Sequence, residues 1–132
     1  MISVETMSAL AEQFFSSDTQ FPKERYPIIT VKNGKPLGGF LYYVDPTTGI
    51  MGVYLKKKAN VWFDHKSLAE LIEFPFYYLG KNIVITTIQG ISEIQSLCEK
   101  TGGVVDKENP KKILFTRENS LKAAQYLKSK YE

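Results

Sequence analysis

Apolar and polar positions repeat with two different periods along the chain, and the first half shows the shorter period. Three runs there are rich in β-branched and aromatic residues and are separated by short polar turns: 27–32 (PIITVK), 36–44 (PLGGFLYYV) and 50–56 (IMGVYLK). Such runs predict strands, and the second, apolar on both faces, should be central. The pair Asn33-Gly34 predicts a type I′ hairpin, because both residues tolerate positive φ angles. The first half should therefore form an antiparallel meander.

Helical spacing appears before this meander and again after it. Residues 6–15 carry Met7, Leu10, Ala11 and Phe14 at the i, i+3, i+4, i+7 positions of one helix face. Ser67-Leu68-Ala69-Glu70 fits a capping box opening a second helix over 67–79. Within that helix Pro75 should produce a kink and Phe76 should be buried.

The remaining residues predict alternating strands and helices. A strand is expected over 82–88, a helix from Ser92 to Thr101, short strands at 104–105 and 113–115, and a last helix capped by Asn119 or Ser120. A strand–helix–strand unit after a meander implies a mixed sheet with helices on its faces. The fold class is thus α/β, as one domain over residues 1–132.

Composition narrows the function classes. With 43% hydrophobic and 23% charged residues, the 132-residue chain is typical of a globular domain. No apolar run is long enough for a membrane span and no signal-peptide pattern is present, so a cytoplasmic protein without membrane contact is expected. One cysteine, Cys98, and one histidine, His65, leave no disulfide and predict no metal site. A net charge of +3 permits an anionic ligand without requiring nucleic acid.

Several local segments occur in an order that resembles a known family. They are Tyr26–Val31, Leu37-Gly38-Gly39-Phe40, Trp62, His65-Lys66, Phe74–Gly80 and Lys100–Gly103. Their order and spacing resemble the GNAT (GCN5-related N-acetyltransferase) fold over about residues 26–116, above all the GNAT-like proteins that phages encode. The segment Thr101–Val105 also looks like internal virion proteins of tailed phages.

This resemblance implies a site for acetyl-CoA. In the family, the exposed edge of the third meander strand pairs with the pantetheine arm, and the following loop and helix start bind the pyrophosphate. Carried onto this sequence, the cofactor-binding residues are Val53, Tyr54, Leu55, Lys56, Lys57, Asn60, His65 and Lys66, with Lys58 adding charge. The three adjacent lysines could equally be a solvated strand end.

Departures from the family pattern weaken the case for catalysis. The segment from Asn60 to His65 contains no glycine, and Ile50–Val53 contains no acid. By the same alignment, Ile91 stands where relatives have Asn, and Cys98 stands where they have a Tyr acid. No catalytic residue is therefore assigned, and acetyl-CoA binding should be weak or absent.

Three functions stay open. The departures favour a non-catalytic binding or structural protein, acting in a virion or the host cytoplasm and meeting a protein partner through tyrosines such as Tyr42, Tyr54 and Tyr77. The alternative is an active acyl-CoA-dependent N-acyltransferase. A nucleic-acid binder, resting only on mild basicity and tyrosines, comes third.

Overall fold

The computed structural model describes residues 2–16, 21–58, 63–87, 101–108 and 112–131. Its strands are β1 (Ile2–Thr6), β2 (Arg25–Lys32), β3 (Lys35–Val44), β4 (Met51–Lys57), β5 (Ile83–Thr87), β6 (Gly103–Val105) and β7 (Lys112–Thr116). Its helices are α1 (Ala9–Phe15), α2 (His65–Tyr77) and α4 (Arg117–Tyr131). The predicted helix from Ser92 lies outside the described residues, apart from Thr101.

The described strands form one mixed sheet in the order β1-β2-β3-β4-β5-β7-β6. Strands β1 to β4 are antiparallel neighbours, β4 and β5 run parallel, and β7 pairs antiparallel with both β5 and β6. The predicted meander, its central strand and its connection through α2 to a parallel β5 are confirmed. The hairpin between β2 and β3 turns at Asn33 and Gly34, whose φ angles of 54° and 75° are those that a type I′ turn requires.

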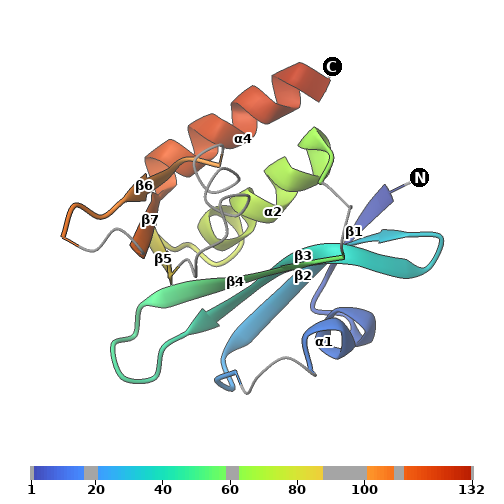
Figure 1. Ribbon diagram of the computed structural model, residues 1–132, viewed down its shortest axis with the longest axis horizontal. Coiled ribbons are helices and arrows are strands. Elements are labelled where there is room, and N and C mark those ends of the chain that lie inside the picture. The colour runs from blue at the N-terminus through green and yellow to red at the C-terminus, as the bar shows by residue number, and fades with distance from the viewer. Residues whose placement is uncertain (1, 17–20, 59–62, 88–100, 109–111, 132) are drawn as a thin grey trace.

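Helices cover both faces of this sheet (Figure 1). On one face, α2 and α4 pack over the larger core, which contains Phe40, Leu71, Phe76 and Ile113. On the other face, α1 packs over a smaller core, which contains Phe15, Ile29 and Leu41. The fold class predicted from the sequence is therefore confirmed, as a mixed α/β sheet between helices.

The helix predicted over residues 6–15 is wrong at its start. Residues Ile2–Thr6 form β1, which pairs with β2, and α1 begins at Ala9 with Ser8 as its N-cap. The Ser8 hydroxyl accepts a hydrogen bond from the Ala11 N–H at 3.1 Å. The helical pattern began too early because Met7, counted as part of the apolar stripe, lies in the turn between strand and helix with φ 52°.

Both predicted caps in the second half are also wrong. Helix α2 begins at His65 after the N-cap residue Asp64, so Ser67 is a buried residue inside the helix. Helix α4 begins at Arg117, and the Thr116 hydroxyl accepts a hydrogen bond from the Asn119 N–H, the bond that an N-cap makes. Ser120 is buried in the second turn, and its Oγ has no hydrogen-bond partner among the described residues. Ser67 and Ser120 are both buried inside their helices, so neither side chain is at a helix start.

Pro75 lies inside α2, as predicted, and Phe76 is buried. A proline has no N–H, so the carbonyl of Leu71, four residues earlier, loses its helical hydrogen bond. The Tyr42 hydroxyl on β3 donates to that carbonyl oxygen at 2.7 Å. Helix α2 is therefore joined to the sheet at the point where its own hydrogen bonding is interrupted.

This arrangement predicts a coupling between Tyr42 and Pro75. Tyr42→Phe leaves the buried Leu71 carbonyl unsatisfied and should cost about 1–3 kcal/mol of unfolding free energy. In a Pro75→Ala background, the new N–H can bond the same carbonyl, so Tyr42→Phe should cost less than half as much. Urea denaturation of the wild type, both single variants and the double variant measures this coupling. Equal costs in the two backgrounds would show that the two residues act independently.

Candidate functional site

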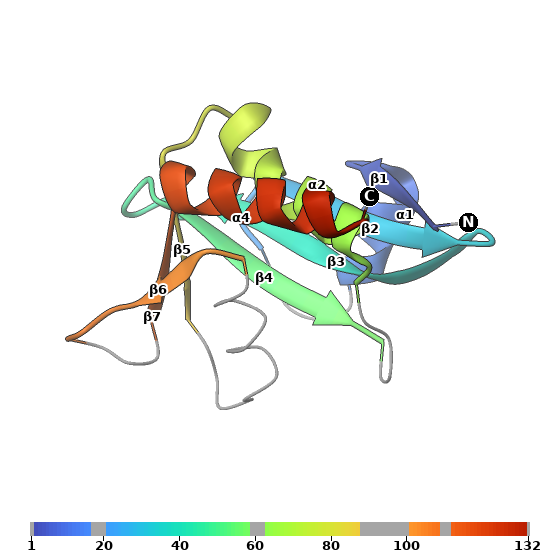
Figure 2. The ribbon, with the colours of Figure 1, turned by 90° about the horizontal axis from the view of Figure 1, so that it is seen from above.

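The sheet divides between β4 and β5. In the described part of the chain, these strands pair only at Met51–Val84 and Gly52–Ile85, and beyond those pairs they diverge (Figure 2). Paired strands lie about 4.8 Å apart. Because the pairing stops after these two residue pairs, the space between the rest of β4 and the end of β5 widens. We call this divergence after Gly52 and Ile85 the fork.

The predicted cofactor-binding residues of β4 lie along one arm of the fork. Val53 and Leu55 pack against the core beneath α2 and α4. Tyr54 faces the opposite side, with its ring centroid 6.2 Å from Phe15 and 5.3 Å from Phe21. All three side chains are half-buried packing residues. A ligand in the fork would therefore meet mainly the backbone of this strand.

The lysines at the end of β4 differ from one another. The Lys56 ammonium donates to the Phe14 carbonyl at 2.6 Å and lies 4.7 Å from the centroid of the Phe14 ring, so it joins β4 to α1. Lys57 is half-buried and pairs with Gly38 of β3. A Cβ added to Gly38 would lie 2.9 Å from the Lys57 Cβ. Lys58 is exposed. The Lys56 ammonium is thus held by α1, whereas Lys58 carries its charge at the surface.

The start of α2 carries both signs of charge. His65 and Lys66 are exposed in the first turn, whereas Asn60 lies outside the described residues. The N-cap Asp64 makes no side-chain capping bond, and its Oδ1 is buried without a hydrogen-bond partner among the residues that the structure describes. A carboxylate at this position offsets part of the positive potential that the helix dipole creates at the N-terminus of α2. Sequence reasoning missed Asp64, because the helix start was placed three residues too late.

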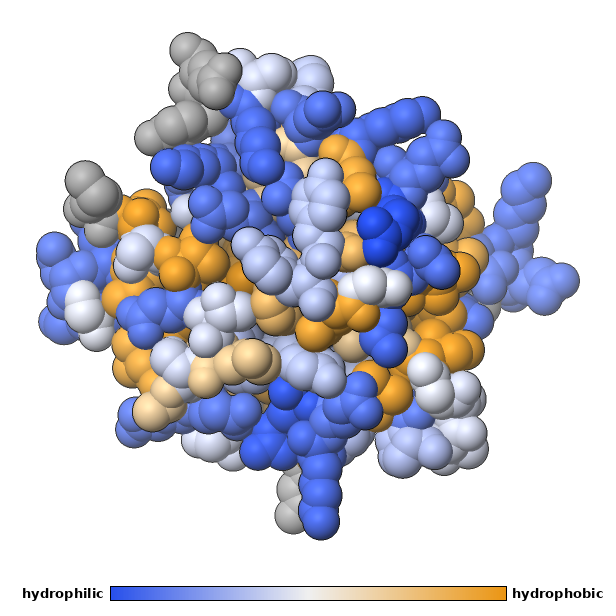
Figure 3. Space-filling model, turned by 180° about the vertical axis from the view of Figure 1, so that it is seen from behind, coloured by the Kyte–Doolittle hydropathy of each residue, from blue (hydrophilic) through white to orange (hydrophobic). Residues whose placement is uncertain are grey.

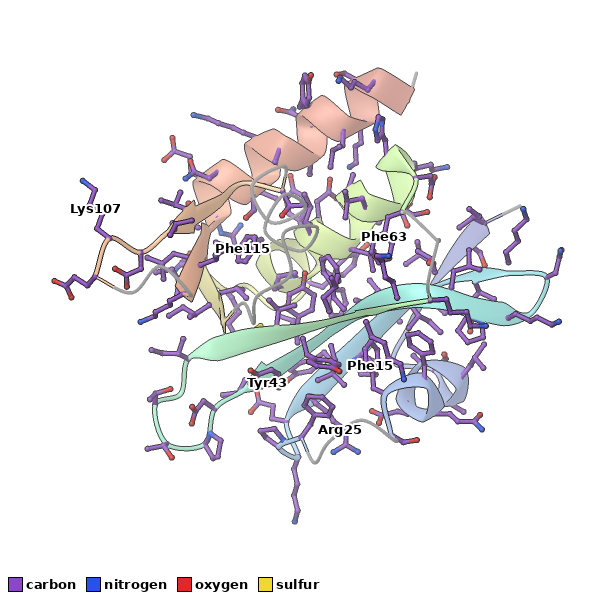
Figure 4. The ribbon with its side chains drawn as sticks, in the orientation of Figure 1. Phe15, Arg25, Tyr43, Phe63, Lys107 and Phe115 are labelled. Atoms are coloured by element: carbon purple, nitrogen blue, oxygen red, sulfur yellow. The ribbon has the colours of Figure 1, made fainter. Side chains whose placement is uncertain are left out.

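Tyr43, which the sequence marks only as one of a set of tyrosines that could pack in the core or line a groove, lies directly at the fork. Tyr43 on β3 pairs with Gly52, and its side chain lies on the α1 side of the sheet (Figure 4). A Cβ at position 52 would lie 2.6 Å from Cζ and 2.7 Å from Oη of Tyr43. Gly52 thus leaves the room that the Tyr43 ring occupies, which places the phenol over the backbone of the last paired residue.

The surroundings of Tyr43 favour its neutral form. Burial raises the pKa of the Tyr43 phenol above its usual value near 10, and the nearby Asp45 carboxylate raises it further. Among the described residues, no hydrogen bond to the Tyr43 hydroxyl occurs. The fork therefore carries a phenol that keeps its proton at neutral pH.

A pocket of about 250 Å³ lies over the fork beside this phenol. Its lining includes Tyr43, Asp45, Ile50, Gly52, Ile85 and Lys112. These residues come from β3, the turn after it, β4, β5 and β7, four strands that are neighbours in the sheet. No local sequence pattern marks this group of residues, because the fork brings together residues up to 69 positions apart.

Other sequence candidates either lie elsewhere or fall outside the described residues. Trp62, Ile91 and Cys98 are outside them. Within them, no group of His, Cys, Asp and Glu side chains could hold a metal ion. In the same part of the chain, no helix has the length and apolar character needed to cross a membrane.

Neither a family model nor a curated protein matches the sequence, but solved structures match the fold. The N-acetyltransferase PseH of Campylobacter jejuni, solved in complex with acetyl coenzyme A, superposes with a TM-score of 0.63 at 12% identity, covering 89% of this chain and 99% of that chain. This chain has the GNAT fold. An acetyltransferase of the GNAT family from Streptococcus pneumoniae matches with a TM-score of 0.60 at 15% identity, over 86% of this chain and 96% of its own. FdhC, a nucleotide-linked sugar GNAT, gives 0.62 at 14% identity over 98% and 92% of the two chains.

The fork lies where the chain passes from the meander through α2 to β5. Within the described residues, the structure from β2 to β7 has the order of strands and helices that the sequence predicted. Identities of 11–15% among the matched structures leave the ligand and the reaction to be argued from the residues of this chain.

Proposed function

We propose that this protein binds an acyl-coenzyme A thioester along β4 and transfers the acyl group to an amine. The observation that carries the proposal is the fork, with Gly52 and the protonated Tyr43 at its apex. A related fold has been solved with acetyl coenzyme A, which makes acetyl-CoA the natural probe. The thioester would supply the activated acyl group.

Different residues of this chain would bind the pantetheine arm, attract the phosphates and supply a proton. The backbone of Val53, Tyr54 and Leu55 would bind the pantetheine arm by adding it to the sheet beside β4. Lys57 and Lys66, aided by Lys56, Asn60 and His65, would attract the phosphates near the start of α2. After the amine has lost one proton to solvent, its nitrogen would bond to the acyl carbon and the carbon–sulfur bond would break. The Tyr43 hydroxyl would give its proton to the departing sulfur and regain one from the nitrogen, which becomes the amide N–H.

Titration with acetyl-CoA tests this proposal directly. Isothermal titration should show binding in the micromolar range, weaker at higher salt because exposed charges attract the phosphates. Binding tighter than this is not expected, because Asp64 adds negative charge at the helix start and Asn60–His65 contains no glycine. The double variant Lys57→Glu, Lys66→Glu should lower the affinity at least tenfold.

A matched pair of lysines controls for the change in net charge. Lys23 and Lys107 are also exposed but lie away from Lys57 and the start of α2: Lys23 precedes β2 near the end of β3 opposite to Lys57, and Lys107 projects from the segment after β6 (Figure 4). The variant Lys23→Glu, Lys107→Glu should bind acetyl-CoA as the wild type does. No binding at millimolar acetyl-CoA, or equal losses in the two double variants, would refute the proposed site.

A non-catalytic binding protein is the second candidate, of the phage-type or virion class that the sequence resembles. It is favoured by the absence of an acid in Met51-Gly52-Val53 and by two exposed tyrosines at the end of α2, Tyr77 and Tyr78, which are 60% and 78% exposed. Tyr42 is wrong as a partner-binding residue, because it is buried. From behind, apolar side chains are separated by hydrophilic ones, so this side shows no continuous apolar docking surface (Figure 3). Refutation of acetyl-CoA binding would leave this candidate.

A further inference from the structure

The pocket over the fork, in contact with Tyr43 and Gly52, has two ends of opposite charge. We propose that it receives the acyl acceptor, and that the acceptor is an extended zwitterion: a primary amine that carries an anionic group several bonds away. This inference rests on the proposed transferase function and adds the substrate class. Three features of the pocket carry it: the carboxylate of Asp45, the ammonium of Lys112 and the apolar side chains between them.

Asp45 supplies the negative end. Its Oδ1 accepts hydrogen bonds from the backbone N–H groups of Thr47 at 2.8 Å and Thr48 at 3.4 Å, which fixes the carboxylate in the turn after β3. Its Oδ2 takes no part in those bonds. Among the described residues, Asp45 forms no ion pair. A cationic amine entering the pocket would therefore meet a carboxylate that is already held in place.

Lys112 supplies the positive end. It is the first residue of β7, opposite Thr87 of β5, and it lines the pocket from the far side of the fork. Within the described part of the chain, its ammonium has no carboxylate partner. Because β7 belongs to the half of the sheet beyond the fork, the two charges approach the pocket from opposite arms.

The separation of the two ends favours extended zwitterions over the smallest ones. Asp45 follows β3 and Lys112 begins β7, and these strands are three spacings apart, or about 14 Å at ~4.8 Å per spacing. The two residues are also offset along the strands, because the Asp45 N–H bonds the Ile50 carbonyl beside the Met51–Val84 pair, whereas Lys112 pairs with Thr87, three residues after Val84. In an α-amino acid, the amine and the carboxylate are attached to one carbon atom, so its two charges lie closer together than this separation favours.

Between the charges, the pocket lining includes apolar side chains beside the Tyr43 phenol. Ile50, which is 40% exposed, and Ile85 line the pocket together with the glycine at the fork. A hydrocarbon spacer would bury against these side chains, whereas a polar spacer would lose hydration there. The pocket volume of about 250 Å³ suits a short linear molecule of this kind.

An acetylation assay with four amines tests the substrate class, with released thiol as the readout. The probes are 5-aminopentanoate, pentylamine, 1,5-diaminopentane and glycine. We expect kcat/KM for 5-aminopentanoate to exceed each of the other three at least tenfold. Lys112→Met should reduce kcat/KM for 5-aminopentanoate to the value for pentylamine. Asp45→Asn should lower kcat/KM for all four amines, while its side-chain oxygen can still accept the hydrogen bonds of the turn.

Two controls separate this inference from the function on which it rests. Lys107→Met, a similar change outside the pocket, should leave the preference unchanged. Both pocket variants should bind acetyl-CoA as the wild type does in isothermal titration. Normal acetyl-CoA binding with no preference for 5-aminopentanoate, or with a preference that survives Lys112→Met, would overturn the zwitterion inference alone. If the wild-type protein shows no acetyl-CoA binding, the transferase proposal is overturned as well.

Discussion

Replacing Phe76 with alanine should destabilise the protein by about 3–5 kcal/mol, the range for large aromatic-to-alanine changes in a core. Phe76 is 2% exposed in α2 and lies against the larger core. It also borders a small cavity of about 20 Å³, so removal of the ring would enlarge an existing space. The free energy of unfolding, measured in urea by circular dichroism, checks this expectation.

The neighbouring Tyr77 provides the control. It belongs to the same helix turn but is 60% exposed, so Tyr77→Ala should change stability by less than about 1 kcal/mol. A loss below about 1 kcal/mol for Phe76→Ala, or similar losses for both variants, would show that the buried face of α2 has been assigned wrongly.

Replacing Tyr43 with phenylalanine should lower the rate of acyl transfer about 100-fold or more, the usual contribution of a positioned general acid. The phenylalanine ring keeps the contact with Phe21, whose centroid is 5.9 Å away, and keeps the position over Gly52. Only the hydroxyl and its proton are lost. The kcat for acetylation of the best amine, measured by thiol release, is the quantity that should fall.

The affinity for acetyl-CoA separates a chemical role of Tyr43 from a structural one. Tyr43→Phe should bind acetyl-CoA with unchanged Kd and unfold at an unchanged temperature. Tyr126→Phe, on the exposed surface of α4, should leave both kcat and Kd as they are in the wild type. An unchanged kcat in Tyr43→Phe would remove this phenol from the mechanism.

The sequence predicted most of the fold because the strands of the meander are strongly β-branched and are separated by turns with clear backbone preferences. The pattern Asn33-Gly34 and the run Ile83–Thr87 are signals of this kind. Strand β1 was missed because its five residues are only partly buried, and their place depends on pairing with β2, a contact more than 20 residues away in sequence. Because β1 contains no buried residue, its sequence carries no strong apolar pattern of its own.

The candidate site was less predictable than the fold. The strand that carries Val53–Lys57 could be located from the strand order, and it lies along the fork, whereas its role in binding a cofactor stays a prediction. Tyr43, Asp45 and Lys112 could not be grouped from the sequence, because only the registers between β3, β4, β5 and β7 bring them to one pocket. Asp64 was not predicted as the N-cap because Ser67, three residues later, begins a capping-box pattern. In the structure Ser67 is buried inside the helix.

The hydrogen bond from Tyr42 to the Leu71 carbonyl also bears on how the molecule opens. In a helix without proline, that carbonyl would be satisfied inside the helix, and the helix could lift from the sheet with its backbone intact. Here one hydrogen bond of the helix is replaced by a bond from a β3 side chain, so lifting α2 breaks a buried hydrogen bond and exposes the core around Phe74 at the same step. Local opening of α2 is thus coupled to the central strand, and the slowest-exchanging amides of both elements should report a similar free energy of opening.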